Sequence, residues 1–182
     1  FDQLFTLLIQ HILKGPSWAD MDRIMDIHDE YSMKSAFFWL VEKGKSSSPY
    51  TGARIENSDY KFNSTRLKEQ RDHILQRGFE SGLHKSVGST SFEQELGRFQ
   101  SSVSFNRNHY LLYRLPDHYN QVEQAGLKVD CTVGFADRYG FRNSFAQPFI
   151  PFNMEKGGPY SFLEVPVNLM DATFRTNLGE SP

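Results

Sequence analysis

A chain of 182 residues with 38% hydrophobic and 23% charged residues has the composition of one ordinary globular domain. Its formal net charge of −2, with no cluster of Lys or Arg, excludes the basic surface that nucleic-acid binding needs. No apolar run reaches the roughly 18 residues that span a bilayer, and the single cysteine excludes an internal disulfide. We therefore expect a single domain over residues 1–182, with no nucleic-acid partner, no membrane span and the cytoplasm as its default compartment.

The first third of the chain combines helical spacing with one strand-like run. Apolar residues at helical spacing predict a helix over Phe1–Lys14 and a second helix over Ser17–Tyr31. The run KSAFFWLV, Lys34–Val41, is nearly continuous in apolar residues, which is typical of a parallel strand covered on both faces. Residues 44–63 contain the run SSSP and few apolar side chains, so we expect a flexible excursion there.

Helices and strands alternate through the middle of the chain. Thr90 to Glu93 has the pattern of a capping box at a helix start. Pro116 and Gly126 are typical of a helix start and a helix end, respectively. The expected elements are a helix over 65–77, a strand over 79–84, a helix over 90–100, a strand over 103–111 and a helix over 116–125.

The stretch from Leu127 to Phe149 begins as a strand and continues as a long loop. Apolar and polar residues alternate up to Val133, and the loop that follows Gly134 is rich in polar and aromatic side chains. Cys131 in this strand is expected to be a small buried residue rather than a nucleophile. A solvated Ω-loop closed by its own aromatic residues is the alternative to a functional loop. A last strand is expected over 161–170, where Pro166 favours an irregular or edge position.

This alternation predicts an α/β fold with a parallel sheet and right-handed crossovers. A complete or partial barrel and an open sheet are both compatible with the pattern. In either architecture a site lies at the carboxyl ends of the strands. Polar groups at those ends are His84, Arg107 with His109, the segment from Asp130 to Arg142, and Asp171.

Five segments in order resemble the polysaccharide deacetylase superfamily, most closely a divergent branch of bacterial deacetylase-like proteins. The segments are KSAFFWLV, RGFESGLHKS, NRNHYL, DCTVGFADRYGFRNSFAQPF and LEVPVNLMDATF. The resemblance implies a distorted, incomplete (β/α) barrel. It also implies metal-assisted hydrolysis of an acetyl group on a sugar or glycan, with zinc as the expected divalent metal. In such a reaction a metal polarises the acetyl carbonyl and binds the attacking water, while an acid and a base move the protons.

The resemblance assigns roles to two groups of residues. GLHKSVGS resembles the metal-binding motif, so His84 is the expected metal ligand, but Gly88 stands where the second His belongs. In NRNHYL, Arg107 corresponds to the residue that orients the catalytic base, and His109 and Tyr110 line the substrate groove.

The strand and loop after residue 127 complete the expected site. Asp130 followed by Phe135 resembles a catalytic Asp with a groove-lining aromatic residue, and we expect Arg107 and Asp130 to carry the catalytic roles. The expected substrate-binding residues are His109, Tyr110, Tyr139, Phe141 and Arg142. We expect the side chains of His84, Arg107, Asp130 and Arg142 to open into one hollow.

The resemblance also places catalytic elements outside the chain. The family's first strand, with adjacent acidic residues, is expected before Phe1, and its late strand, with the acid His, after Pro182. The chain therefore resembles the middle of a longer protein, and we expect little or no activity from it alone. Two other hypotheses stay open: an inactive relative that binds carbohydrate, and a purely structural or interaction domain.

Overall fold

The computed structural model describes residues 19–88, 90–171 and 173. It divides into two compact units, residues 1–35 and residues 36–182. In the first unit the described helix is α2, Ala19–Glu30, which agrees with the second helix expected from the sequence. The Oγ of Ser35 lies 2.7 Å from Nδ1 of His28 in this unit. The helix expected over Phe1–Lys14 lies outside the described residues.

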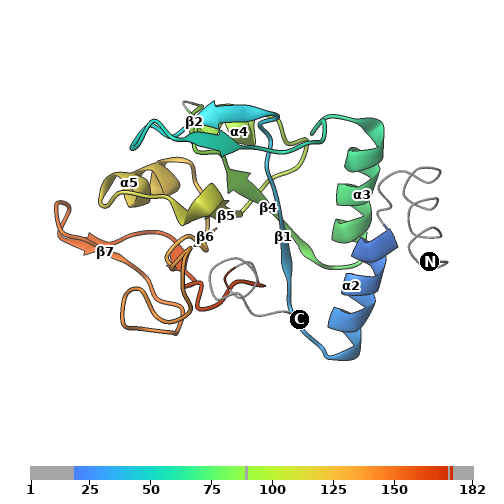
Figure 1. Cartoon of the computed structure of the whole chain (residues 1–182). Helices are drawn as coiled ribbons and strands as arrows, with labels where there is room; N and C mark the ends of the chain where they lie inside the picture. The colour runs from blue at the N-terminus through green and yellow to red at the C-terminus, as the bar shows by residue number, and fades with distance from the viewer. Residues whose placement is uncertain (1–18, 89, 172, 174–182) are drawn as a thin grey trace. The chain divides into compact units, whose positions relative to one another are not determined.

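The second unit is built on a five-stranded parallel sheet, which confirms the predicted α/β class (Figure 1). Its strands lie in the order β1, β4, β5, β6 and β9, so sheet order follows chain order. Their bounds are Ala36–Trp39 for β1, Glu80–Lys85 for β4, Phe105–Asn108 for β5, Val129–Asp130 for β6 and Leu163–Glu164 for β9. The last strand lies at an edge of the sheet, where a neighbouring proline is tolerated.

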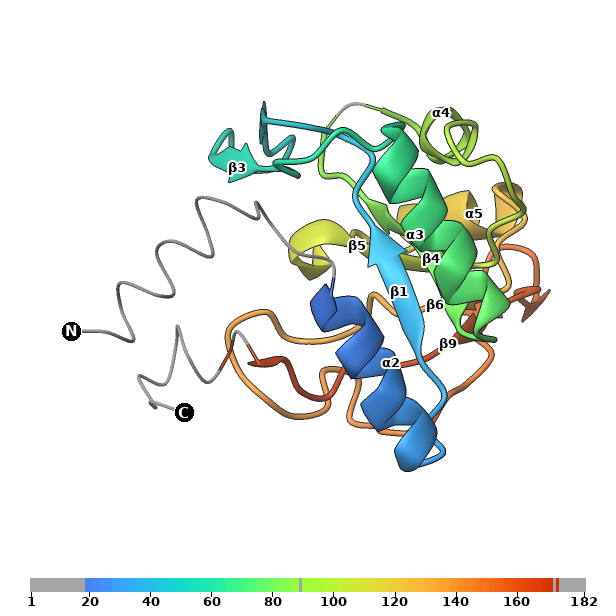
Figure 2. The same ribbon diagram turned by 90° about the vertical axis from the view of Figure 1, so that its right-hand side faces the viewer.

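Three helices connect the first four strands of this sheet. They are α3, Thr65–Gln76, α4, Phe92–Leu96, and α5, Asp117–Gln124. Right-handed crossovers between strands that progress in one direction place their helices on one face of the sheet. In agreement, all three helices lie on the same side of the sheet in Figure 2. The core between helices and sheet contains fully buried apolar side chains from both layers, among them Leu67, Ile74, Leu83, Val122 and Leu127.

Residues 44–63, expected as a flexible excursion, contain an antiparallel hairpin. Its strands are β2, Lys45–Ser47, and β3, Arg54–Glu56. Apolar residues are few in this hairpin, but Ile55 of β3 is buried, and polar side chains add further contacts. The buried Ser48 hydroxyl accepts hydrogen bonds from the backbone of Tyr50 and Thr51, and Gly52 adopts a φ of +70°.

The strands β6 and β9 are shorter than the expected 127–133 and 161–170 because side chains replace part of the backbone ladder. The backbone N–H of Asn108 donates to the hydroxyl of Thr132, at 3.1 Å, instead of a carbonyl. The N–H of Val133 donates to a carboxylate oxygen of Glu164, at 3.0 Å. Regular pairing therefore stops at Asp130, although the chain stays beside its neighbours.

A long connection joins β6 to β9, as the sequence predicts. It contains a second small hairpin, β7, Phe152–Asn153, with β8, Gly158–Pro159, which the sequence pattern does not predict. Isolated bridges tie the connection to the end of the sheet, from Gly134 to Val167 and from Phe149 to Glu164. A short 3₁₀ turn, η1, His109–Leu111, follows β5 where the sequence predicts that the strand continues.

Candidate functional site

The register of the sheet separates its polar side chains into two groups. Side chains alternate between faces along a strand, and residues paired in a parallel register share a face. His84 is paired with Arg107, so these two side chains lie on one face. Asn106 is paired with Asp130, and Asp130 with Glu164, so these three lie on the other. We call the first the histidine face and the second the helix face, because the latter contacts α4 and α5.

On the histidine face, His84 meets His109. The Nε2 atom of His84 lies 2.9 Å from Nδ1 of His109, and Nδ1 of His84 lies 2.9 Å from the carbonyl oxygen of Arg107. The Nε2 atom of His109 lies 2.8 Å from the carbonyl oxygen of Glu56 in β3. Both rings are thus held between a partner ring and a backbone carbonyl.

The turn η1 brings His109 to this position. Tyr110 and Leu111 adopt positive φ values of 58° and 50°, a left-handed conformation that is strained for bulky residues. This conformation turns the backbone directly after β5, so the strand does not continue past Asn108. The ring of His109 therefore lies beside His84, near the end of β4. The ring of Tyr110 packs on His109 with centroids 4.3 Å apart, and half of Tyr110 remains exposed.

Burial lowers the pKa of both histidines of this pair. The pKa of His84 is lowered to about 3, mainly by burial and further by the charges of His109 and Arg107. Burial also lowers the pKa of His109. The pKa of Arg107 is lowered by burial too, and the nearby Cys131 and Asp171 act in the opposite direction.

On the helix face, Asp130 is the centre of a closed hydrogen-bond network. Its carboxylate accepts from Nε2 of His118 in α5 and from the amide of Asn106, each at 2.6 Å, and from the hydroxyl of Thr132 at 2.7 Å. These residues are all buried. Glu164 lies beside them, and burial together with the charge of Asp130 raises its pKa well above the ordinary value.

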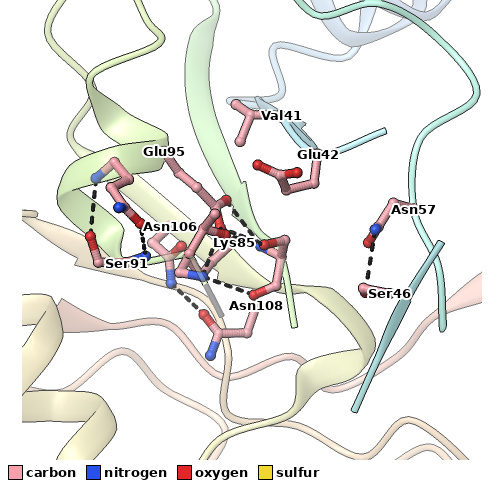
Figure 3. Close-up of polar contacts among 12 residues, drawn as sticks. Val41, Glu42, Ser46, Asn57, Lys85, Ser91, Glu95, Asn106 and Asn108 are labelled. Carbon is pink, nitrogen blue, oxygen red and sulfur yellow. Dashed lines mark hydrogen bonds and ion pairs between the residues drawn. The ribbon is translucent and has the colours of Figure 1, made fainter. Parts of the chain in front are cut away.

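A second buried network on the helix face centres on Glu95 of α4 (Figure 3). Its carboxylate accepts hydrogen bonds from the ammonium of Lys85, at 2.7 Å, and from the hydroxyls of Ser86 and Thr90. A cavity of about 910 Å³ lies alongside, and Lys85, Gly88 and Asn108 line it together with residues of α4 and α5. His84 is not among the lining residues, so this cavity is separate from the histidine face.

The structure therefore brings together some of the expected site residues and separates others. His84, Arg107 and His109 meet at the carboxyl ends of β4 and β5, with Tyr110 beside them. Asp130 points to the opposite face and contacts none of them in its hydrogen bonds. The four residues expected around one hollow are thus divided between two faces.

The loop residues lie outside both networks. Tyr139 and Phe141 are exposed by 61% and 53%, respectively. Arg142 donates to the carbonyl oxygen of Gly134 at 3.0 Å, and its guanidinium lies 4.5 Å from the ring centroid of Tyr113. Because the ring of Tyr113 also lies 5.7 Å from that of His118, Arg142 belongs to the helix-face side.

Cys131 has the environment of an inert thiol. It is partly exposed rather than fully buried. Burial, assisted by the charges of Asp130 and Glu164, nevertheless raises its pKa to about 12. The thiol stays protonated at neutral pH, which supports the expectation that it is not a nucleophile.

Several residues of these networks carry no signal in the sequence. His118 and Glu95 lie on helices, and no motif links them to the strands that they contact. Asn106 and Asn108 have a strand spacing of two that places them on one face with Asp130, but only the register between strands reveals it.

Comparison with protein-family models, with curated proteins and with solved structures found no match. Within residues 19–88, 90–171 and 173, no group of three or more His, Cys, Asp or Glu side chains could hold a metal ion. In the same part of the chain, no helix has the length and apolar character needed to cross a membrane. In the described part of the chain, two imidazole nitrogens, on His84 and His109, face each other.

Proposed function

We propose that this chain contributes the metal-binding and substrate-positioning part of a hydrolase that removes acetyl groups from a sugar or glycan. The observation that carries the proposal is the meeting of His84, His109 and Arg107 at the carboxyl ends of two neighbouring parallel strands. Carboxyl ends of parallel strands are where α/β proteins hold their reactive groups. The strand order, which follows the chain without reversal, supports the finer assignment of an incomplete (β/α) barrel.

Each residue of the histidine face has a role in this proposal. His84 holds a divalent metal, with zinc as the first candidate. The bound metal supplies a Lewis acid for the acetyl carbonyl and lowers the pKa of its water. Arg107 orients a carboxylate that acts as general base, and its buried guanidinium keeps that carboxylate ionised. The half-exposed ring of Tyr110 offers an apolar face on which a sugar ring packs.

Asp130 takes a positioning role in this proposal. Its carboxylate joins β5, β6 and α5 through Asn106, Thr132 and His118. Because Asn106 and Arg107 are adjacent in β5, fixing the first also fixes the direction of the second.

The proposal is tested by acetate release from N-acetylated sugar oligomers, with added Zn²⁺ or Co²⁺, using the complete product of the gene. We expect His84→Ala to abolish turnover, and His73→Ala, a histidine substitution on α3, to leave it unchanged. Absence of acetate release with either metal, or equal turnover in His84→Ala, would reject the proposed activity.

An inactive carbohydrate-binding relative is the second candidate, and a specific observation favours it. Gly88 stands where the resemblance expects the second histidine ligand. A Cβ added at Gly88 would meet only the Cβ of Ser46, at 3.8 Å. A side chain would therefore fit at this position, so steric exclusion does not explain the glycine. Binding of a glycan through Tyr110, Tyr139 or Phe141 without acetate release would select this alternative.

A further inference from the structure

The two histidines of the histidine face make three polar contacts with only two protons. Backbone carbonyls accept hydrogen bonds and never donate them. Nδ1 of His84 must therefore carry a proton toward Arg107, and Nε2 of His109 must carry one toward Glu56. A neutral imidazole has a single N–H, so the two nitrogens that face each other, 2.9 Å apart, are both left with lone pairs.

A third proton between the rings would resolve this conflict at an electrostatic cost. It would make the pair cationic in a partly buried place, next to the guanidinium of Arg107. In the neutral pair, two lone pairs therefore remain directed into one space.

We propose that Nε2 of His84 and Nδ1 of His109 are two ligands of one divalent transition-metal ion. Imidazole nitrogens bind zinc at about 2.0–2.1 Å, and a tetrahedral ion places two of them roughly 3.3 Å apart. The two rings, whose nitrogens lie 2.9 Å apart, would need to separate by a few tenths of an ångström to admit the ion. A histidine that ligates a metal usually donates its other N–H to a carbonyl or carboxylate, which fixes the ring. Both rings have this arrangement, with the carbonyls of Arg107 and Glu56 as the acceptors.

Gly88 stands where the resemblance expects the second histidine ligand, and in this site His109, from the turn η1, supplies that ligand instead. The site rests on the proposed function in one respect, because the metal is the one that His84 holds there. The count of protons on the two rings does not depend on any activity of the chain. Two protein ligands leave the remaining coordination positions to water or to substrate oxygens. The carboxylate of Asp171 near Arg107 offsets part of the positive charge around the ion.

The site is tested by titrating the 182-residue chain with Zn²⁺ and recording long-range ¹H–¹⁵N correlations of its imidazoles. We expect one equivalent of zinc to shift Nε2 of one histidine and Nδ1 of another, and to leave the other four of the six histidines unchanged. Calorimetry should show affinity at least about tenfold weaker in His84→Ala and in His109→Ala, because even outer partners of a metal ligand contribute that much. His73→Ala is the matched control and should bind as the wild type does.

Other outcomes overturn the site. They are no saturable binding of Zn²⁺ or Co²⁺ by the wild-type chain, shifts at other histidines, or unchanged affinity in both variants. Three N–H protons shared by the two rings in the metal-free chain, and no response to metal, would show a proton between the rings instead. The wild-type spectrum decides even where a variant fails to fold. Metal binding here without acetate release in the complete product would reject the proposed activity and leave the site standing.

Discussion

Adjacent residues of β4 and β5 take part in different networks. His84 faces His109, whereas Lys85 turns to the other side and pairs with Glu95. In β5, Arg107 lies with His84, whereas Asn106 binds Asp130. Adjacent residues near the end of one strand thus belong to two chemically different environments, one on each face of the sheet. Substitutions in these strands should therefore separate into effects on stability and effects on metal binding.

The first prediction concerns the closed network. His118→Ala removes a buried donor and leaves part of the Asp130 carboxylate without a partner, so we expect a loss of about 3 kcal/mol in the free energy of unfolding. Urea denaturation measures this loss. Zinc affinity should stay at the wild-type value, because His118 lies on the helix face. A loss below about 1 kcal/mol, or a matching loss of metal affinity, would contradict the division into two faces.

The second prediction concerns the pH dependence of stability. The pKa of Glu164 is raised above 4.5 in the folded chain, by burial and by Asp130, so the folded state keeps a proton that the unfolded state releases. Its contribution is fully present below pH 4.5 and is lost as the pH rises toward the folded pKa. Glu164→Gln removes the ionisation. Relative to the wild type, the variant should gain up to about 1.4 kcal/mol per pH unit as the pH rises above 4.5.

Thermal or urea unfolding between pH 5 and 9 measures this difference. Glu155→Gln, at an exposed position of the second hairpin, is the control and should follow the wild-type curve. Parallel curves for the wild type and Glu164→Gln would show that Glu164 is ionised in the fold.

At the scale of elements, side-chain contacts determine where helices and strands end. Ser91 begins α4 with a complete capping box. Its hydroxyl accepts a hydrogen bond from the Gln94 N–H, and the side-chain oxygen of Gln94 accepts one from the Ser91 N–H. The sequence places this box one residue earlier, with Glu93 as the returning side chain, and extends the helix to residue 100. The buried Glu95 instead binds Lys85 and Ser86, and the helix ends at Leu96.

Two helix starts of the chain allow a matched test of capping. Ser91→Ala should lower stability by about 1 kcal/mol, because the hydroxyl satisfies a free N–H of the first turn. Ser64 occupies the same position before α3 but makes no side-chain cap. Ser64→Ala should therefore change the unfolding free energy by much less, and equal losses in the two variants would contradict the assignment of the cap.

Gly134, which follows β6, allows the backbone to come close to Val167, which follows β9. A Cβ added at Gly134 would lie 2.6 Å from the carbonyl oxygen of Val167 and 2.7 Å from its Cβ. We expect Gly134→Ala to cost about 1–3 kcal/mol, since backbone must move to make room. Gly158→Ala meets no atom within 4 Å and serves as the control. Denaturation midpoints of the two variants measure the difference, and equal midpoints would show that the bridge adjusts freely.

At the scale of the molecule, the sequence predicts the parallel sheet but not the faces of its strands. KSAFFWLV and the alternating helix signals are strong enough to give the strands and their crossovers. Apolar and polar residues alternate along the stretch from Leu127 to Val133, but Asp130 and Thr132 on its polar side are fully buried. The alternation therefore does not predict the direction of Asp130. The contact between His84 and His109 depends on the left-handed turn at Tyr110, a conformation that no local propensity of tyrosine favours.

The first hairpin, β2 with β3, is also not predicted from the sequence. Residues 44–63 resemble a flexible segment because they contain few apolar side chains. Backbone pairing, the buried Ile55 and hydrogen bonds of the Ser48 and Ser58 hydroxyls hold the hairpin region in place. Contacts between a side chain and a distant backbone carry no periodic signal. Helix and strand identity could therefore be predicted where packing dominates, and the candidate site could be predicted only in part.

The link between His109 and the first hairpin goes through the carbonyl of Glu56, not through its side chain. Substitutions at position 56 can therefore change the charge and size of that side chain without breaking the hydrogen bond between its backbone carbonyl and the imidazole of His109. A change in hairpin length, by contrast, would displace the oxygen and free the ring to rotate. Surveys of natural variation should thus find position 56 permissive to substitution and the hairpin intolerant of insertions.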